Sequence, residues 1–332
     1  MRRSVLPFLP VSLFGSVLLS AVTGSVRVPF ESVLGALFGF RVEGLAATVI
    51  DLRLVRTVAA LVSGASLGVA GAVLQSLFRN PLADPFVLGI SSGSSLAIAA
   101  TLIAGTGLGL ISAYDPQALY VAGALGALAV SLAVIALSSV LRSNLGLVLV
   151  GVMLGYLASG LTTLLVVTSD VERVRAFTFW TLGTFSASKW SVVNSVLPIA
   201  VGSLLASLLV AKPLNALLFG EDAAATMGAS VRASRVGAIA VAASLVSCSV
   251  VISGPVGFVG LAAPHAVRIL LKTEDNRLTV PLSALVGAEL AVLSDIAART
   301  LMSPLELPVT AVTSLFGAPI VLVLVMRRWG LR

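Results

Sequence analysis

The sequence predicts an all-α integral membrane protein with about ten transmembrane helices. Of its 332 residues, 58% are hydrophobic and only 11% are charged, whereas soluble domains carry about 25% charged residues. Its mean hydropathy is +1.09. A helix crosses the hydrocarbon core with about 20 residues, and the apolar blocks leave room for about ten such helices. We therefore expect residues 1–332 to form a single membrane domain with no soluble catalytic domain.

Ten apolar blocks are predicted to span the membrane, and we expect both termini on the cytoplasmic side. With a cytoplasmic N-terminus, 13 of the 21 Lys and Arg residues lie at cytoplasmic ends, as the positive-inside rule favours. The basic, apolar start resembles a signal peptide, but its apolar run continues past Val26 without a small-residue cleavage site, so we expect an uncleaved span. The predicted spans are 8–29, 56–78, 88–107, 117–140, 145–168, 190–211, 235–253, 256–271, 279–298 and 308–326.

Small residues mark two spans as members of a helix bundle. Between the first two spans, residues 30–55 are amphipathic and are predicted to lie along the interface. The second span then carries Gly64 and Gly68 four residues apart, a spacing that lets helix backbones approach closely. The fifth span repeats the pattern at Gly151 and Gly155. Both spans are therefore predicted to be buried among neighbouring helices.

The connection after the second span is broken by two prolines and followed by a polar helix start. Irregular backbone at membrane depth must face protein or water. The hydroxyls of Ser91, Ser92 and Ser94 are therefore predicted to line a translocation path near its inner end, although a plain tight connection is the alternative. A similar break follows residue 253. With five spans in each half, the two halves would be inverted repeats, as in many transporters.

A short external helix with an aromatic belt is predicted between the fifth and sixth spans. Phe177, Phe179, Trp180 and Trp190 are suited to a membrane interface, and the neighbouring charges are suited to water.

The polar segment 211–235 separates two long apolar blocks and is predicted to face the cytoplasm. Glu221 and Asp222 suit the positive N-terminal end of a helix, three alanines follow, and Gly228 can close that helix in a left-handed conformation. We expect a short helix and turns on the membrane surface. A solvated connecting loop is the alternative.

Several function classes are excluded by missing motifs. No GxxxxGK[ST] phosphate loop is present, so the chain is not expected to bind ATP itself, and HExxH, CxxC and GxSxG are also absent. Cys248 is the only cysteine, which excludes a disulfide framework and a cysteine metal cluster. The basic residues are scattered without interleaved aromatics, so we expect no nucleic-acid partner. His265 is predicted to be a packed or capping residue and not a metal ligand.

Few ionisable residues fall within the spans, which argues against ion coupling. Glu289 lies near the middle of the ninth span, where it would pair with an arginine such as Arg268 or lie in a wet crevice. A passage without an ion site needs an external energy source, and segment 211–235 is where that source could act. An ion-coupled secondary carrier and an intramembrane enzyme using Glu289 and His265 are the competing hypotheses.

Three arginines are predicted at the outer side. Arg53 and Arg56 precede the second span, and Arg299 follows the ninth. Because guanidinium groups bind carboxylates with two hydrogen bonds, these residues could dock an acidic surface of a delivery protein. The alternative is that they extend to the interface alongside lipid.

Four segments closely resemble the permeases of the iron-siderophore and cobalamin importers, the FecCD-like type II ABC importers. In family order, they are LRLVRTVAALVSGASLGVAGAVLQSLFRNPLADPFVLGISSGSS at 52–95, GEDAAATMGASVRASR at 220–235, SGPVGFVGLAAPHAVRIL at 253–270 and ELPVTAVTSLFGAPIVLVLVMRR at 306–328.

The resemblance implies a permease subunit without catalytic activity in the plasma membrane. It implies a homodimer with the path at its interface, two cytoplasmic ATPase subunits that bind ATP and Mg, and an extracytoplasmic solute-binding protein. This chain is expected to bind no cofactor, and its cargo is expected to be a ferric siderophore, with haem, cobalamin or molybdate as alternatives.

The resemblance also assigns site residues. The segment that matches the ATPase coupling loop supplies the coupling residues Glu221, Asp222, Ala224, Ala225, Gly228 and Arg232. The docking arginines of the family match Arg53 or Arg56, and Arg299. Val55 stands where relatives usually have proline, which leaves open which of the first two arginines points at the partner.

Overall fold

The computed structural model describes residues 7–329 except 25, 27, 38–39, 41–42, 106–115, 139 and 142–143. Thirteen α-helices and no β-strands occur in these residues, which confirms the predicted all-α class. The signal-peptide-like residues 1–6 lie outside the described residues, as do the end of the predicted third span at 106–107 and parts of the predicted interfacial segment 30–55.

Ten of the helices overlap the ten predicted spans, one helix to each span. Six are long and apolar enough to cross a membrane by length and composition. They are α3 (Leu45–Leu77), α5 (Pro116–Ser138), α6 (Asn144–Val167), α8 (Trp190–Leu218), α10 (Val231–Ser253) and α12 (Asn276–Thr300). The other four are the shorter apolar helices α1 (Phe8–Val22), α4 (Ile90–Ala100, continued by the π-helical turn η2, Thr101–Gly105), α11 (Val259–Leu271) and α13 (Val309–Trp329).

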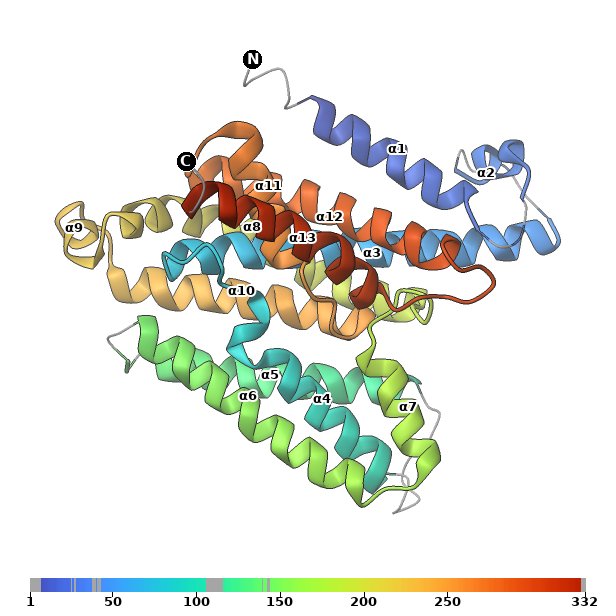
Figure 1. Cartoon of the computed structure of the whole chain (residues 1–332), viewed down its shortest axis with the longest axis horizontal. Helices are drawn as coiled ribbons and strands as arrows, with labels where there is room; N and C mark the ends of the chain where they lie inside the picture. The colour runs from blue at the N-terminus through green and yellow to red at the C-terminus, as the bar shows by residue number, and fades with distance from the viewer. Residues whose placement is uncertain are drawn as a thin grey trace.

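The central helix of the bundle is α3, which is buried along most of its length and packs against α8, α10, α11 and α12 (Figure 1). Its glycines lie against the backbone of neighbouring helices. A Cβ atom added to Gly64 would lie 2.3 Å from the carbonyl oxygen of Gly287, and one added to Gly68 would lie 2.1 Å from that of Ser283. The predicted close helix approach is therefore confirmed, and both contacts are with α12.

Helix α3 begins at Leu45, eleven residues before the predicted start of the second span at residue 56. Ile50 in these added turns is buried and packs in a small cluster with Ala21, Val28 and Val33. This tertiary packing holds the first turns in helical form. The predicted interfacial segment therefore divides into a short helix α2 (Phe30–Leu37) and the start of α3.

For α6, the prediction of burial holds only on one face. Gly151 and Gly155 lie against the backbone of Gly89, as predicted for small residues. The remaining surface of α6 is largely open within the single chain, with Tyr156 70% and Leu164 66% exposed. In a membrane helix, an apolar exposed surface is compatible with lipid or with another subunit, so the glycine pair alone did not determine burial.

Two breaks occur where the sequence predicts them. After α3, Asp84 caps a short 3₁₀ helix, η1 (Pro85–Leu88), and Gly89 with φ +72° leads into α4. After α10, Gly254 with φ +69° leads towards α11. Glycine adopts these positive φ angles without steric cost. The inverted relation of the two halves stays a prediction.

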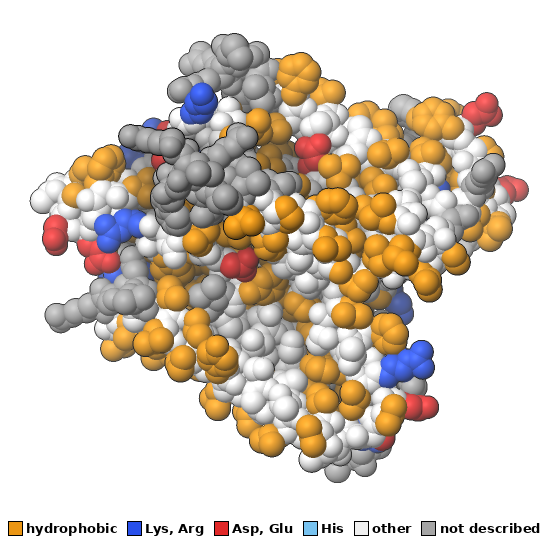
Figure 2. All heavy atoms as spheres, in the orientation of Figure 1, with side chains coloured by type: hydrophobic (Ala, Val, Ile, Leu, Met, Phe, Trp, Pro, Cys, Tyr) orange, Lys and Arg blue, Asp and Glu red, His pale blue; other side chains and the backbone are white. Residues whose placement is uncertain are grey.

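The bundle has two polar ends. The short helix α9 (Glu221–Thr226) lies at one end, and α2 and the short helix α7 (Val171–Thr181) lie at the opposite end (Figure 1). Figure 2 shows hydrophobic side chains spread over the surface between them and most of the visible charged side chains near the two ends. We call these the α9 end and the α7 end.

Candidate functional site

At the α9 end, the predicted short helix and its glycine stop are confirmed. Glu221 and Asp222 lie in the first turn of α9, and Gly228 adopts φ +82°. The N–H of Ala229 donates to the carbonyl of Ala224 at 3.0 Å, which closes the helix as a left-handed glycine cap does. The hydroxyl of Ser230 then caps α10 by accepting from the N–H of Ala233 at 3.4 Å.

The six predicted coupling residues divide into two groups. Asp222, Ala225, Gly228 and Arg232 are exposed and available to a partner. Ala224 is fully buried in the core of the bundle. Glu221 pairs with the buried Arg235, whose second amino group donates to the carbonyl of Leu141 at 2.7 Å. The first four therefore form a surface, and Ala224 and Glu221 fix that surface to the helices beneath it.

The predicted polar segment 211–235 is shorter than expected. Helix α8 continues through Pro213 to Leu218, and α10 already begins at Val231. Leu214 and Leu217 are buried, so core packing extends α8 beyond the apolar run in the sequence.

A cavity adjoins α9 at this end of the bundle. It measures about 450 Å³ and includes Lys212, Phe219, Met227 and Arg277 in its lining. Most of its lining lies within the predicted segment 211–235, and sequence reasoning missed only Arg277, which α12 contributes.

At the α7 end, Arg53 is buried and holds the end of α1. Its guanidinium donates to the carbonyls of Ala21 at 3.0 Å and Val22 at 2.7 Å, and also to that of Val26. These carbonyls lie at or just after the C-terminus of α1, where no intrahelical donors remain. Arg53 therefore performs a structural capping role in this conformation.

Arg56 and Arg299 share one buried carboxylate. The Nε of Arg56 lies 2.7 Å from Asp295, and the Nε of Arg299 lies 3.5 Å from the other oxygen of the same group. Arg56 also contacts Glu306 at 2.9 Å, and Arg299 donates to the hydroxyl of Ser20 at 2.6 Å. Asp295 has no exposed surface, whereas the Glu306 side chain is 45% exposed.

This cluster, comprising Arg56, Asp295, Arg299 and Glu306, joins α3, α12 and the loop before α13. Its two acids were missed by sequence reasoning. The spacing of Asp295 and Arg299, four residues apart on one helix, was the available signal. Because its guanidinium groups already have partners within the chain, docking of another protein stays a proposal.

Between the ends, the structure separates the three predicted path serines. Ser91 and Ser92 line a cavity of about 360 Å³, whereas Ser94 is fully buried, and its hydroxyl has no hydrogen-bond partner. The cavity also includes Phe177 of α7. It therefore lies towards the α7 end and not near the opposite, predicted inner end.

The predicted pairing of Glu289 with Arg268 is wrong. Glu289 accepts a hydrogen bond from the hydroxyl of Ser12 at 3.1 Å, while Arg268 binds Gln75 and Glu274. Glu289 of α12 thus contacts α1, whereas Arg268 of α11 contacts α3 and the turn before α12. His265 is buried, with its Nδ1 3.0 Å from the carbonyl of Leu261 in the preceding turn, as expected for a packed residue.

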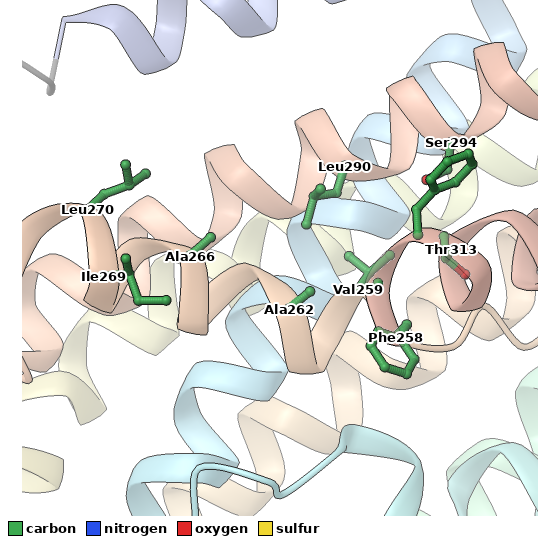
Figure 3. Close-up of a pocket in the computed structure, with 11 residues that line it drawn as sticks. Phe258, Val259, Ala262, Ala266, Ile269, Leu270, Leu290, Ser294 and Thr313 are labelled. Atoms are coloured by element: carbon green, nitrogen blue, oxygen red, sulfur yellow. The ribbon is translucent and has the colours of Figure 1, made fainter. Parts of the chain in front are cut away.

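A further groove of about 370 Å³ lies between α11, α12 and α13 (Figure 3). Figure 3 shows Val259 and Ala262 of α11 on one side of it and Leu290 of α12 on another. Its lining contains no charged side chain, so it offers no group that would select an ionic solute.

The arrangement defines a class of protein: a multi-span membrane permease. Ten apolar helices form the bundle, a hydroxyl-lined cavity lies between α4, α6 and α7, and each end of the bundle has a polar surface. The chain belongs to the FecCD transport family, whose profile matches residues 12–327.

Two named relatives align with 84% and 98% of this chain. The vitamin B12 import system permease protein BtuC of Vibrio vulnificus is 37% identical over 98% of this chain and 94% of its own. The hemin transport system permease protein HmuU of Yersinia pestis is 35% identical over 84% of this chain and 83% of its own. A solved inward-facing structure of an ABC transporter assigned to the metal-chelate type superposes with a TM-score of 0.84 at 31% identity, covering 98% of this chain and 99% of that one.

Proposed function

We propose that the chain is the membrane subunit of an ATP-driven type II importer for a metal chelate. It acts as a homodimer in the plasma membrane, with two separate ATPase subunits that bind ATP and Mg and with an extracytoplasmic solute-binding protein. The names of its relatives, which transport hemin and vitamin B12, support this class of cargo. A ferric siderophore is our first candidate, with haem, cobalamin and molybdate as alternatives.

The observation that carries the proposal is the attachment of the exposed α9 surface to the bundle. The ion pair between Glu221 and Arg235 and the burial of Ala224 fix α9 to its base. Through α10, which packs against α3, α5 and α8, this base is continuous with the interior helices. A displacement of α9 by an ATPase would therefore move helices inside the membrane, as alternating access requires.

At the opposite end, the arginine cluster is the proposed docking site for the solute-binding protein. Of its two acids, Asp295 is buried and Glu306 is half-exposed. An acidic residue of the partner could therefore reach Arg56 by exchanging with Glu306, while Asp295 keeps the arginines in place. Arg53 holds the C-terminal end of α1, the helix that also carries Ser20, the partner of Arg299.

The coupling proposal is tested with the chain and its cognate ATPase and binding protein in proteoliposomes. Glu221→Arg removes the partner of Arg235, and Gly228→Trp places a bulky side chain on the exposed turn. We expect both to reduce ATPase association and ATP-driven uptake. Gly202→Trp is the control, because an added Cβ at Gly202 meets nothing within 4 Å. Normal association and uptake in both variants would refute the coupling role of α9.

The same proteoliposomes distinguish an ATP-driven importer from the rival function, an ion-coupled secondary carrier. Uptake driven by an ion gradient with this chain alone would identify a secondary carrier instead.

The cargo is tested on the solute-binding protein, by titration with a ferric hydroxamate, haemin, cyanocobalamin and molybdate. We expect tight binding of one of the three chelates, and binding of molybdate alone would exclude a chelate as cargo.

A further inference from the structure

The cavity beside α9 has two positively charged side chains in its lining and no acidic one. It measures about 450 Å³ and is formed by the C-terminal end of α8, the start of α12 and the turn after α9. Its cations are Lys212 of α8 and Arg277 of α12, and both residues are exposed. Most of the remaining lining is apolar and includes Pro213, Ala216, Phe219, Met227 and Ala229.

The two cations are the polar groups of the lining that remain available to a ligand. Among the residues that the structure describes, neither Lys212 nor Arg277 forms a salt bridge. The Asn215 amide is used within the protein, because it donates to Asp275 and accepts from Asn276. Asp275 itself accepts from the backbone N–H of Arg277 at 3.0 Å as the cap of α12. The lining therefore favours an anion.

An exposed apolar stripe on α8 leads from this cavity into the membrane region. Val201, Leu205 and Leu209 are 45%, 62% and 79% exposed, and their spacing of four residues places them on one face of the helix. Lys212 follows three residues later on the same face. From Val201 to Lys212 the helix rises about 16 Å at 1.5 Å per residue, which is about half of the hydrocarbon core. The stripe is therefore as long as one leaflet is thick.

This combination suits an amphipathic anion better than a soluble one. Inorganic phosphate would satisfy the cations but would leave Phe219 and Met227, which are 73% and 62% exposed, in water. A phospholipid satisfies both parts of the surface. Its phosphate can accept two hydrogen bonds from a guanidinium and pair with an ammonium, and aromatic rings are suited to the headgroup region. Basic pockets between membrane helices bind anionic headgroups in this way.

We infer that this cavity binds the headgroup of an anionic phospholipid, with Lys212 and Arg277 holding its phosphate and the α8 stripe contacting an acyl chain. The lipid would touch α8, α12 and the turn after α9 at once, so it would hold the base of the proposed coupling surface to the bundle. Gly228 belongs to both surfaces. The inference requires that the bundle lies in a membrane and is independent of the cargo.

Binding is tested by native mass spectrometry of the purified full-length chain in detergent. Equimolar dioleoylphosphatidylglycerol and dioleoylphosphatidylcholine are added, and we expect the wild type to retain the anionic lipid several-fold more. The double variant Lys212→Gln, Arg277→Gln should lose this preference. Arg175→Gln, Lys189→Gln is the matched control, because it removes the same two charge types from exposed residues near the α7 end.

Two outcomes of this experiment would overturn the inference. Equal retention of the two lipids by the wild type would do so whatever the variants show. An equal loss of preference in both double variants would show that the anionic lipid is attracted by overall charge and not by this cavity.

The source of the phosphate is tested by competition. Inorganic phosphate and dihexanoylphosphatidylglycerol are each added to the chain with dioleoylphosphatidylglycerol bound. We expect inorganic phosphate to displace none of it and the short-chain lipid to displace it several-fold less well than a second long-chain lipid, because the stripe contributes to binding. The long-chain lipid should also raise the melting temperature of the wild type and not that of Lys212→Gln, Arg277→Gln. Displacement by inorganic phosphate would identify a soluble-anion site and overturn the lipid assignment.

A protein occupant gives a different result. If the wild type shows no lipid preference and Lys212→Gln, Arg277→Gln fails to associate with the ATPase, the cavity is part of the ATPase contact and the lipid assignment is wrong. Failure of ATP-driven uptake by the wild type would refute the importer proposal, whereas lipid retention is measured on the chain alone and would be unaffected.

Discussion

At the scale of single residues, the most constrained group is the Asp295 carboxylate. It has no exposed surface and lies between two arginines, 2.7 Å from Arg56 and 3.5 Å from Arg299. A buried charge is tolerated only when it is paired and hydrogen-bonded. Glu306 completes the cluster from an exposed position, so the two acids should respond differently to substitution.

Replacing the buried acid should destabilise the protein far more than replacing the exposed one. Asp295→Asn leaves Arg56 and Arg299 without their shared anion, and breaking such a buried pair typically costs about 3 to 5 kcal/mol. Glu306→Gln should cost less than about 1 kcal/mol, because a half-exposed ion pair is screened by water. Thermal unfolding of each purified variant in the same detergent measures the difference. Similar losses of stability in the two variants would show that burial does not determine how much each acid contributes to stability.

Removing the exposed acid should strengthen docking. Glu306→Gln releases one amino group of Arg56, which lies 2.9 Å from Glu306 in the structure. We expect tighter binding of the solute-binding protein in nanodiscs, with a gain that is larger at low salt, where screening is weak. Asp170→Asn, which removes another exposed acid at the α7 end, is the matched control. Weaker binding by Glu306→Gln would mean that Glu306 itself contacts the partner.

At the scale of elements, the contact of α3 with α12 depends on the absence of side chains. Gly64 meets Gly287 and Gly68 meets Ser283 through backbone atoms, so the two helices approach more closely than any larger residue would allow. Close packing of this kind is intolerant of added volume. The N-terminal end of α12, in contrast, depends on a polar cap by Asp275.

A side chain at Gly68 should separate these helices. Its Cβ would lie 2.1 Å from a backbone oxygen that no rotamer change can move. Gly68→Val should therefore cost about 3 kcal/mol or more, at the upper end of overpacking effects. Gly202→Ala, where the added atom meets open space, should change stability by less than about 1 kcal/mol. Equal shifts in the melting temperatures of Gly68→Val and Gly202→Ala in detergent would show that close packing at Gly68 is not required.

The cap of α12 should make stability sensitive to acid. A hydrogen bond from the backbone N–H of Arg277, with help from the Asn215 side chain, lowers the pKa of Asp275. Because the folded-state pKa lies below the unfolded one, this stabilisation is complete above about pH 4 and is lost as the pH falls further. Asp275→Ala should cost about 1 kcal/mol at neutral pH.

A matched variant isolates the charge. Asparagine caps helices about as well as aspartate, so Asp275→Asn should be nearly as stable as the wild type at neutral pH and should lose less stability between pH 5 and about pH 3. The unfolding of the wild type and of Asp275→Asn, measured across this pH range, shows whether the Asp275 charge causes the loss. A parallel acid loss in wild type and Asp275→Asn would show that other carboxylates dominate.

At the scale of the whole molecule, the two polar ends should lie on opposite sides of the membrane. The α9 end carries the exposed Asp222, and the α7 end carries Val171, which is 83% exposed. In intact cells, with Cys248→Ser as background, an impermeant maleimide should label Val171→Cys. Asp222→Cys should be labelled only after the cells are opened. The reverse pattern would place α9 outside and remove it from contact with a cytoplasmic ATPase.

Short-range features of the chain could be predicted from the sequence. The ten helices, the breaks near Gly89 and Gly254, and the glycine stop of α9 each depend on neighbouring residues, because hydrophobic length and backbone conformation are local properties. The motifs that resemble the FecCD-like permeases also predicted the family correctly.

The tertiary structure alone decided which side chains meet. Arg56 and Asp295 are 239 residues apart, and nothing local indicates that they share an ion pair or that the predicted docking arginines are buried. Likewise, only the packing of α4 against α5 and α6 places Ser91 and Ser92 in the cavity and turns Ser94 away from it. The physical reason is that apolar patterning specifies that a helix lies in the membrane, whereas its rotation and its neighbours are set by contacts distant in sequence.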